Sequence, residues 1–226
     1  MRSVKILEIK NITHDVKSFK LEKPFGYRFK PGQATEVAIA KDGWEERRRP
    51  FTFTSLNSDK NLEFIIKGYP VVEYPNHEGV TEEIHKLRVG DKLLINDPWG
   101  TINYKGEGIF IAGGAGITPF IAIFRDLASK KKLVNNMLIF SNKTEEDIIL
   151  HDELSQIFEK NDLILTLTQK EREGYEYGRV DRSFIKNHVS DLKKHFYICG
   201  PKEMVDDLKI VLSSMGVSAD SVVFEE

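Results

Sequence analysis

The stretch IFIAGGAGITP, residues 109–119, decides the fold of the second half of this chain. A run of apolar residues typical of a buried strand leads into a glycine-rich turn, and the turn leads into a segment of helical character. Thr118 is predicted to cap this helix, and Pro119 suits its first position, where a missing N–H costs no hydrogen bond. The amides of such a turn and the positive end of the helix favour an anion such as a pyrophosphate. From this segment alone, the alternative is that the glycines only let the helix pack closely against the strand.

The composition indicates a globular protein with a sizeable core. Hydrophobic residues make up 40% and charged residues 30% of the 226 residues. The formal net charge of −2 gives no global positive field for nucleic acid or an anionic membrane. Residues 1–17 lack the continuous apolar run of a signal peptide or membrane helix, so we expect a cytoplasmic protein without membrane insertion. The single cysteine, Cys199, excludes a disulfide framework and a cysteine-ligated cluster within this chain, and we expect no metal site.

Strand and helix patterns divide the chain into an α+β arrangement of two domains. The first half has short strands separated by turn signals, which favours a β-barrel or sandwich. Its strands are expected at 4–9, 18–21, 35–39, 51–56, 62–66 and 92–95, with one short helix at 81–87. The second half alternates strand and helix, which is typical of a parallel sheet with helices on both faces. Its strands are expected at 108–112, 136–140, 163–168 and 195–198, and its helices at 119–130, 148–159, 182–187 and 202–215. We predict domains at 1–103, an antiparallel barrel, and 104–226, an α/β parallel-sheet domain.

A second candidate site segment is Cys199-Gly200-Pro201, which follows a predicted strand and precedes a predicted helix. Ligands of open α/β sheets bind at this carboxyl edge, so the Cys199 thiol is placed to contact a nicotinamide. The alternative is a small buried residue ahead of a tight turn.

Polar residues follow the second strand of this half, where the ribose of an adenosine is expected. Asn142 and Lys143 are the candidate contacts, and Lys143 suits a 2′-phosphate although no paired arginines accompany it. The acidic residues at 145–147 have the alternative role of beginning a helix. Arg179 is a second candidate contact, against the alternative of a solvated arginine. NADH and NADPH both stay open.

The first half contains the stretch RRRPFTFTS at residues 47–55. Strand alternation puts Arg49, Phe51 and Phe53 on one face, and Thr52 and Thr54 on the other. Taken alone, three consecutive arginines favour a solvated turn.

Together these segments resemble the ferredoxin–NADP⁺ reductase superfamily, over nearly the whole chain. The local sequence is most similar to the cytochrome b5 reductase and flavodoxin reductase branches, and the resemblance implies that the barrel binds FAD and the α/β domain binds NADH or NADPH. The family's Arg-x-Tyr/Phe-Ser/Thr motif corresponds to Arg49, Phe51 and Thr52, with Pro50 between them. The resemblance implies that Arg49 meets the flavin phosphate, Phe51 lines the isoalloxazine or ribityl region, and Thr52 bonds near flavin N5.

The resemblance extends to two further flavin segments. One is 65–69, with Ile66, Lys67 and Tyr69, and the other is a phosphate turn at 78–81. In the latter, Gly79, Val80 and Thr81 would open the short helix, against the alternative of an ordinary capped helix.

Two features near the end of the chain bear on the reaction. Many relatives finish with an aromatic residue that covers the flavin, but Phe224 lies too early for that role. Glu225 resembles a family carboxylate near flavin N5, against the alternative of a frayed terminal charge. The stretch at 141–150 resembles the corresponding part of cytochrome b5 reductase closely, which favours NADH.

These inferences define the expected site. We expect catalytic roles for Thr52, Cys199 and Glu225. The residues expected to bind the cofactors are Arg49, Pro50, Phe51, Thr52, Ile66, Lys67, Tyr69, Gly79, Val80, Thr81, Gly113, Gly114, Gly116, Ile117, Thr118, Pro119, Asn142, Lys143, Cys199, Gly200 and Pro201.

The resemblance implies an FAD-dependent NAD(P)H reductase. Hydride would pass from nicotinamide to FAD, and single electrons would leave to a separate ferredoxin, flavodoxin or cytochrome. One alternative is a reductase of free flavin, ferric chelates or quinones. A second is a non-catalytic subunit that binds flavin or nucleotide.

Overall fold

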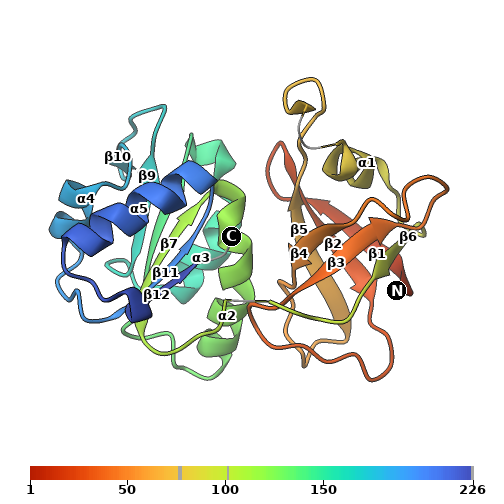
Figure 1. Cartoon of the computed structure of the whole chain (residues 1–226), viewed down its shortest axis with the longest axis horizontal. Coiled ribbons are helices and arrows are strands. Elements are labelled where there is room, and N and C mark those ends of the chain that lie inside the picture. Colours follow the sequence, from red (N-terminus) through yellow and green to blue (C-terminus); the bar gives the residue numbers. More distant parts are fainter. Residues whose placement is uncertain (76–77, 101, 225–226) are drawn as a thin grey trace.

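The computed structural model describes residues 1–75, 78–100 and 102–224. Its strands form two six-stranded sheets that are separate in sequence and lie side by side (Figure 1). The first sheet is antiparallel and the second is parallel, so the predicted fold class is confirmed.

The antiparallel sheet has the strand order β4-β3-β6-β1-β2-β5. The strands are β1 (Arg2–Asn11), β2 (Val16–Glu22), β3 (Ala34–Ile39), β4 (Arg49–Thr52), β5 (Asn61–Lys67) and β6 (Lys92–Ile95). Alternation places one set of side chains inside: Val4 and Ile6 of β1 are buried, whereas the intervening Lys5 is exposed. The ring of Phe53 stacks on Phe29 at 4.2 Å within this core. Helix α1 (Val80–Lys86) adds Val80 and Ile84 to the same apolar cluster.

The strand expected at 51–56 ends at Thr52, because the chain there changes its hydrogen-bonding partner. Up to Thr52 the strand pairs with β3, and the Phe53 amide still donates to the Gln33 carbonyl at 3.0 Å. The Thr54 amide instead donates to the carbonyl of Glu63 in β5, also at 3.0 Å. This switch brings the two outer strands of the sheet together and nearly closes the barrel.

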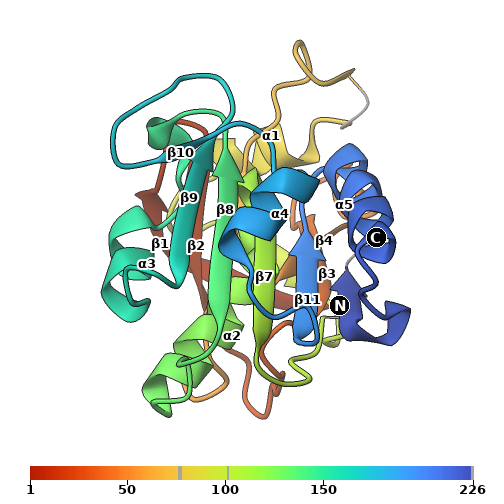
Figure 2. The ribbon, with the colours of Figure 1, turned by 90° about the vertical axis from the view of Figure 1, so that its left-hand side faces the viewer.

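The parallel sheet has the order β10-β9-β8-β7-β11-β12. Its strands are β7 (Gly108–Gly113), β8 (Met137–Asn142), β9 (Leu163–Leu167), β10 (Glu176–Tyr177), β11 (His195–Cys199) and β12 (Val222–Phe224). Its helices are α2 (Thr118–Ser129), α3 (His151–Ile157), α4 (Arg182–His188) and α5 (Lys202–Ser214), with short 3₁₀ turns η2 (Gly114–Ile117), η3 (Glu145–Asp147) and η4 (Ala219–Ser221). Figure 2 shows the strands edge to edge with α4 and α5 on the near face.

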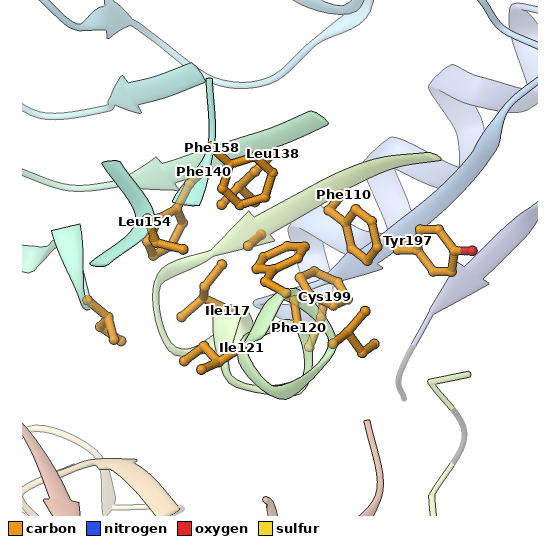
Figure 3. Packing of buried hydrophobic residues seen from close by; sticks show 14 of the residues in the cluster. Phe110, Ile117, Phe120, Ile121, Leu138, Phe140, Leu154, Phe158, Tyr197 and Cys199 are labelled. Atoms are coloured by element: carbon orange, nitrogen blue, oxygen red, sulfur yellow. The ribbon is translucent and has the colours of Figure 1, made fainter. Parts of the chain in front are cut away.

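Both faces of the parallel sheet are covered, as the near-continuous apolar strands predict. In β7, Phe110 and Ala112 pack in the cluster formed with α2 and α3, whereas Ile109 and Ile111 pack in the cluster formed with α4 and α5. Figure 3 shows the first cluster, in which the rings of Phe110 and Phe120 lie next to each other.

One sequence expectation for this half was wrong in detail, and two short strands were not predicted. The helix expected at 148–159 covers only His151–Ile157, because Leu150 has a φ of 54° and separates the buried Ile148 and Ile149 from the helix. Strand β10 has only two residues in a polar stretch, so no alternation marks it. Strand β12 is a three-residue apolar segment that we had not assigned to the sheet.

The two halves share an apolar interface. Val16, Ile65 and Ile102, all from the N-terminal half, are buried in the cluster around α2. Gly32 lies against the same region, where an added Cβ would stand 2.1 Å from the Ile102 carbonyl oxygen and 3.3 Å from the Ile123 side chain. Helix α2 therefore lies between the two sheets, as Figure 1 shows. Over the residues described, no helix has the length and apolar character needed to cross a membrane.

Candidate cofactor-binding cleft

A cleft of about 750 Å³ opens between the two halves. From the N-terminal half it is lined by Val16, Lys67, Tyr69 and Tyr74. From the parallel sheet it is lined by Gly113, Gly114, Ala115, Gly116, Ser141, Asn142, Lys143, Asp147, Ile149, Thr168, Arg179, Val180, Gly200, Pro201, Lys202, Glu203, Met204 and Asp207. Most of the latter lie at or just beyond the carboxyl ends of β7, β8, β9 and β11, where ligands of open α/β sheets bind.

The glycine turn forms one wall of the cleft. It runs from the end of β7 through η2 directly into α2. Gly114 has a φ of +50°, and an added Cβ there would meet nothing within 4 Å. The backbone of the turn is therefore open to a ligand at Gly114.

Thr118 does not cap α2, which corrects the sequence expectation. Residue Ile117 holds the N-cap position without a side-chain hydrogen bond, and Pro119 lies in the first turn as predicted. The Thr118 hydroxyl donates to the Ala115 carbonyl at 3.0 Å. Because η2 continues directly into α2, Thr118 is already helical and its hydroxyl bonds back to the preceding turn.

The other glycines let two loops meet in backbone contact. A Cβ on Gly116 would lie 2.3 Å from the Cys199 carbonyl oxygen, and one on Gly113 would lie 2.7 Å from the Met204 sulfur. A Cβ on Gly200 would lie 3.1 Å from the Gly113 nitrogen. The glycine turn and the segment Cys199–Pro201 thus form one continuous floor. Gly113, Gly116 and Gly200 allow the close packing, whereas Gly114 leaves the backbone open to a ligand.

Asn142 is the most informative side chain in the cleft. It ends β8, it is only 4% exposed, and it lines the cleft. Its amide nitrogen and its amide oxygen are both buried, and neither has a hydrogen-bond partner in the described structure. A buried amide left unpaired costs roughly 1–3 kcal/mol, so these two atoms are available to hydrogen-bond a ligand in the cleft.

Charged side chains surround the adenosine side predicted from the sequence. Lys143 and Arg179 both line the cleft, Lys143 after β8 and Arg179 after β10. The Arg179 guanidinium lies 4.0 Å from the Glu203 carboxylate, and both side chains are largely exposed. Asp147 also lines the cleft, but its carboxylate accepts from the Thr144 amide and hydroxyl at 2.8 and 2.7 Å. The acidic stretch therefore begins a helical turn, which was the alternative considered for it.

Lys67 brings a positive charge from the N-terminal half into the cleft. Its Nζ lies 2.6 Å from Asp15, on the loop after β1. Burial lowers the pKa of Lys67, but the hydrogen bond and charge of Asp15 outweigh burial, so the pKa lies above its ordinary value. Lys67 is therefore a fixed cation that faces the parallel sheet. Ile66, its neighbour, is buried in the barrel core and is placed away from the cleft lining.

Cys199 lies under the floor of the cleft. Its side chain is 9% exposed and belongs to the core cluster against α2, as Figure 3 shows, and it is not among the cleft-lining residues. The alternative considered from the sequence, a small buried residue ahead of a tight turn, describes its packing.

The segment Arg49–Thr52 lies on the barrel, outside the lining of this cleft. The Arg49 guanidinium donates to the Glu78 carboxylate at 2.8 Å and to the Arg48 carbonyl at 2.8 Å. Phe51 is half-buried beside the core, Pro50 is exposed, and Thr52 is buried. The strand alternation thus places the partly exposed Arg49 and the buried Thr52 on opposite faces of the strand.

The turn before α1 meets Arg49 through Glu78. Glu78 and Gly79 have φ of 52° and 73°, and Gly79 is the N-cap residue of α1. The Thr81 hydroxyl accepts from the Tyr69 amide at 3.1 Å, which connects this turn with the other flavin segment predicted from the sequence. The fold therefore brings the three predicted flavin segments together.

The last described residue, Phe224, lies in the parallel sheet. Phe224 ends β12, packs against the cluster under α5, and has the Lys209 Nζ 3.9 Å from its ring centroid. Glu225, the proposed proton relay, lies outside the described residues. Sequence reasoning missed Val16 and Thr168, which line the cleft, because neither belongs to a recognisable motif.

Comparisons with known proteins agree with this geometry. Residues 3–104 match the oxidoreductase FAD-binding domain, and residues 110–209 match the oxidoreductase NAD-binding domain. The chain is 31% identical over 250 residues to NADH-cytochrome b5 reductase 2 of Mycosarcoma maydis, covering 95% of this chain and 69% of that protein. It is 26% identical over 238 residues to the reductase component of propane 2-monooxygenase from Rhodococcus jostii (strain RHA1), covering 98% of this chain and 62% of that protein.

A solved structure shows the same fold. The ferredoxin NADP⁺ reductase of Neisseria gonorrhoeae, with bound FAD and NADP, superposes with a TM-score of 0.84 at 21% identity, covering 99% of this chain and 97% of that chain. The two domain matches and the 31% identity to the Mycosarcoma maydis protein show that the chain belongs to the ferredoxin–NADP⁺ reductase superfamily. It is an FAD-dependent NAD(P)H oxidoreductase, and it spans about two thirds of the length of the curated relatives above.

Proposed function

We propose that this protein transfers a hydride from NADH or NADPH to FAD and then passes single electrons to a separate ferredoxin, flavodoxin or cytochrome. The observation that carries the proposal is the unpaired amide of Asn142 in a cleft lined by both halves. A nicotinamide nucleotide supplies donors and acceptors of the kind that amide lacks. The relatives support the acceptor class, since one is named for cytochrome b5 and another is a reductase component.

In this proposal the parallel sheet binds the nucleotide. The open backbone at Gly114 and the start of α2 receive the pyrophosphate, because glycine amides and a helix N-terminus favour an anion. Asn142 and Lys143 hold the adenosine side, and the floor of Cys199, Gly200 and Pro201 supports the nicotinamide side. Cys199 then acts on the nicotinamide by packing from below.

The barrel binds FAD through the surface made by β4, β5 and the turn before α1. Arg49 would provide the phosphate contact, Phe51 would provide the aromatic wall, and Thr52 would hydrogen-bond near flavin N5. Gly79, Val80 and Thr81 hold the phosphate turn, and Lys67 and Tyr69 extend this surface towards the cleft. The predicted boundary between residues 103 and 104 is the division we propose between the two domains.

Bound FAD accepts a hydride from the reduced nicotinamide and can release the two electrons one at a time. The chain's contribution is to hold two rings in contact and to keep the phosphates fixed, which converts the reaction into an intramolecular one. Glu225, resembling a family carboxylate, is proposed to move a proton at flavin N5.

The experiment is anaerobic stopped-flow mixing of the FAD-loaded protein with NADH and with NADPH. We expect the reduced nucleotide to bleach the flavin absorbance. The absorbance should then recover only when ferredoxin, flavodoxin or cytochrome is added to reoxidise the flavin. A protein that retains no FAD after reconstitution would contradict the proposal. Bleaching without transfer to any carrier, and with rapid transfer to ferric chelates or quinones, would favour the small-acceptor alternative. Flavin and nucleotide binding without bleaching would favour a non-catalytic subunit.

Two further aspects of the proposal have their own tests. The nucleotide preference is proposed to be NADH, because the stretch at 141–150 is similar to cytochrome b5 reductase, and the ratio of the two bleaching rates tests it. A cytoplasmic location is also part of the proposal, and cell fractionation tests it.

A further inference from the structure

Arg125 of α2 joins the two halves of the molecule through one guanidinium group. Its Nε and Nη2 donate to the two carboxylate oxygens of Glu153 at 2.6 and 2.8 Å. Its Nη1 donates to Glu63 Oε2 at 2.5 Å and to the Thr54 carbonyl at 2.8 Å. Glu153 belongs to α3, so one edge of the guanidinium is bound within the parallel-sheet half and the other edge is bound to the barrel.

On the barrel side of this contact, further hydrogen bonds hold Glu63 in place. The Thr54 hydroxyl donates to Glu63 Oε2 at 2.7 Å, and the Ser18 hydroxyl donates to Glu63 Oε1 at 3.1 Å. The Thr54 amide donates to the Glu63 carbonyl, and the Glu63 amide donates to the Ser55 hydroxyl, each at 3.0 Å. Arg125 therefore binds where β4 and β5 close the barrel, and that point cannot move without breaking the closure.

The contact is largely removed from solvent. The Arg125 and Glu63 side chains are 23% and 19% exposed. Burial raises the pKa of Glu63, but the charge and hydrogen bonds of Arg125 and the hydroxyls of Thr54 and Ser18 outweigh burial, so the pKa lies below its ordinary value. A charge pair of this kind has one preferred geometry. Burial removes water from each charged group, and only well-formed hydrogen bonds compensate for that loss.

Both ends of the contact continue into the segments that would hold the two cofactors. Helix α2 begins at Thr118, at the end of the glycine turn, and carries Arg125 seven residues further along. Thr54 follows Thr52 by two residues, and Glu63 precedes Lys67 by four residues on β5. A rotation between the halves would thus move the nucleotide segment relative to the flavin segment.

We propose that Arg125 is a positioning residue that sets the separation and angle between the flavin and nicotinamide segments. The inference rests on the proposed hydride transfer and goes beyond it by naming the contact that fixes its geometry. Hydride transfer is sensitive to such a contact, because a misplacement of about 1 Å costs on the order of 100-fold in rate. Binding of each cofactor to its own half does not require the contact.

The test compares Arg125→Gln and Glu63→Gln, which break the contact between the halves, with Glu153→Gln, which breaks only the contact within the parallel-sheet half. All are loaded with FAD and mixed anaerobically with NADH over a range of concentrations. We expect the limiting bleaching rate to fall about 10- to 100-fold in the first two variants, with FAD content and the half-saturating NADH concentration near those of the unaltered protein. Glu153→Gln is expected to stay within about 3-fold. The double variant Arg125→Gln/Glu63→Gln should be no slower than the slower single variant, because both remove one interaction.

A melting temperature lowered in all three variants, with unchanged limiting rates, would overturn the proposal and leave Arg125 a purely structural residue. Equal slowing by Glu153→Gln and Glu63→Gln would also overturn it. Amide hydrogen exchange provides a readout without turnover, so the proposal is testable even if NADH does not bleach the unaltered protein. Exchange in residues 53–55 and 61–63 should rise in Arg125→Gln but not in Glu153→Gln, and unchanged exchange in Arg125→Gln would overturn the positioning role.

Discussion

The guanidinium of Arg49 lies 2.8 Å from the carboxylate of Glu78, and this pair joins β4 to the turn before α1. Glu78 has a φ of 52°, a conformation that few residues other than glycine adopt readily. The arginine proposed to bind the flavin phosphate therefore has a competing anion beside it. The affinity for FAD is therefore expected to depend on the charge of Glu78.

Replacing Glu78 by glutamine should strengthen FAD binding, because it removes the negative charge that competes for Arg49. The pair is partly solvated, so we expect a gain of about 3- to 10-fold in affinity, measured by flavin fluorescence quenching with the FAD-depleted protein. The matched control is Glu46→Gln, which removes the exposed partner of Arg48 at 2.8 Å. Weaker FAD binding in Glu78→Gln would show that the carboxylate holds Arg49 in a productive position instead.

Replacing Arg49 by alanine should weaken FAD retention more than folding. A charge-assisted hydrogen bond to phosphate contributes about 1.5–3 kcal/mol, which is roughly 10- to 150-fold in the dissociation constant. The same fluorescence titration measures it, and circular dichroism melting without FAD provides the comparison with folding. Unchanged FAD affinity would contradict the placement of the phosphate at Arg49.

Replacing Asn142 by leucine should have opposite effects on stability and on nucleotide binding. The substitution removes two buried polar atoms without partners, so the free energy of unfolding should rise by about 1 kcal/mol. NADH binding, measured by calorimetry, should weaken about 10-fold because the bonds to the nucleotide are lost.

The control for that prediction is Asn136→Leu in the same half. Asn136 is fully buried, and its amide accepts from the Gly108 nitrogen at 3.0 Å and donates to the Leu133 carbonyl at 3.2 Å. This variant should be destabilised, because its partners are left unsatisfied. Destabilisation of Asn142→Leu to the same extent would argue that Asn142 has a purely structural role.

Replacing Gly116 by alanine should displace the glycine turn from its floor. The new Cβ would stand 2.3 Å from the Cys199 carbonyl oxygen and 2.6 Å from the Gly200 Cα, and backbone atoms there cannot rotate away. We expect a loss of about 1–3 kcal/mol in stability and about 10-fold or more in NADH affinity. Gly174→Ala is the control: its Cβ meets nothing within 4 Å, although the φ of +89° strains it, so this variant should lose stability and retain NADH affinity. Wild-type affinity in Gly116→Ala would show that the turn does not bind the nucleotide.

The Glu63 carboxyl should make stability depend on pH in the acid range. Its folded-state pKa is lower than its ordinary value of 4.5. Its contribution is therefore complete above that value and is lost as pH falls below it towards the folded-state pKa. Urea unfolding from pH 7 to pH 3 should show the difference between the unaltered protein and Glu63→Gln shrinking below about pH 4.5. A difference independent of pH would mean that the two states bind protons at Glu63 equally.

Much of the fold was predictable because its signals are local. Short apolar segments bounded by turn residues located most strands of both sheets, and β6 spans the predicted residues. The barrel closure at Thr54 was not predictable, because it depends on a hydrogen bond to Glu63 across nine residues that changes the pairing of the strand. The cap expected at Thr118 was wrong for a related reason, since the continuation of η2 into α2 is set by the packing of the turn on Cys199.

For the site, the sequence by itself determined which segments are the candidates for cofactor binding: the glycine turn, the Cys199–Pro201 segment and the arginine-led strand each have a composition that suits phosphates or rings. Only the tertiary structure decided which of their atoms are available. Among the residues it describes, it leaves the Asn142 side-chain amide without a partner, places Cys199 beneath the cleft floor, and gives Arg49 a competing carboxylate. It also brings Arg125 to Glu63, 62 positions away in the chain. The physical reason is that composition and turn geometry depend on neighbouring residues, whereas satisfaction of a buried polar group depends on which distant groups the packing brings to it.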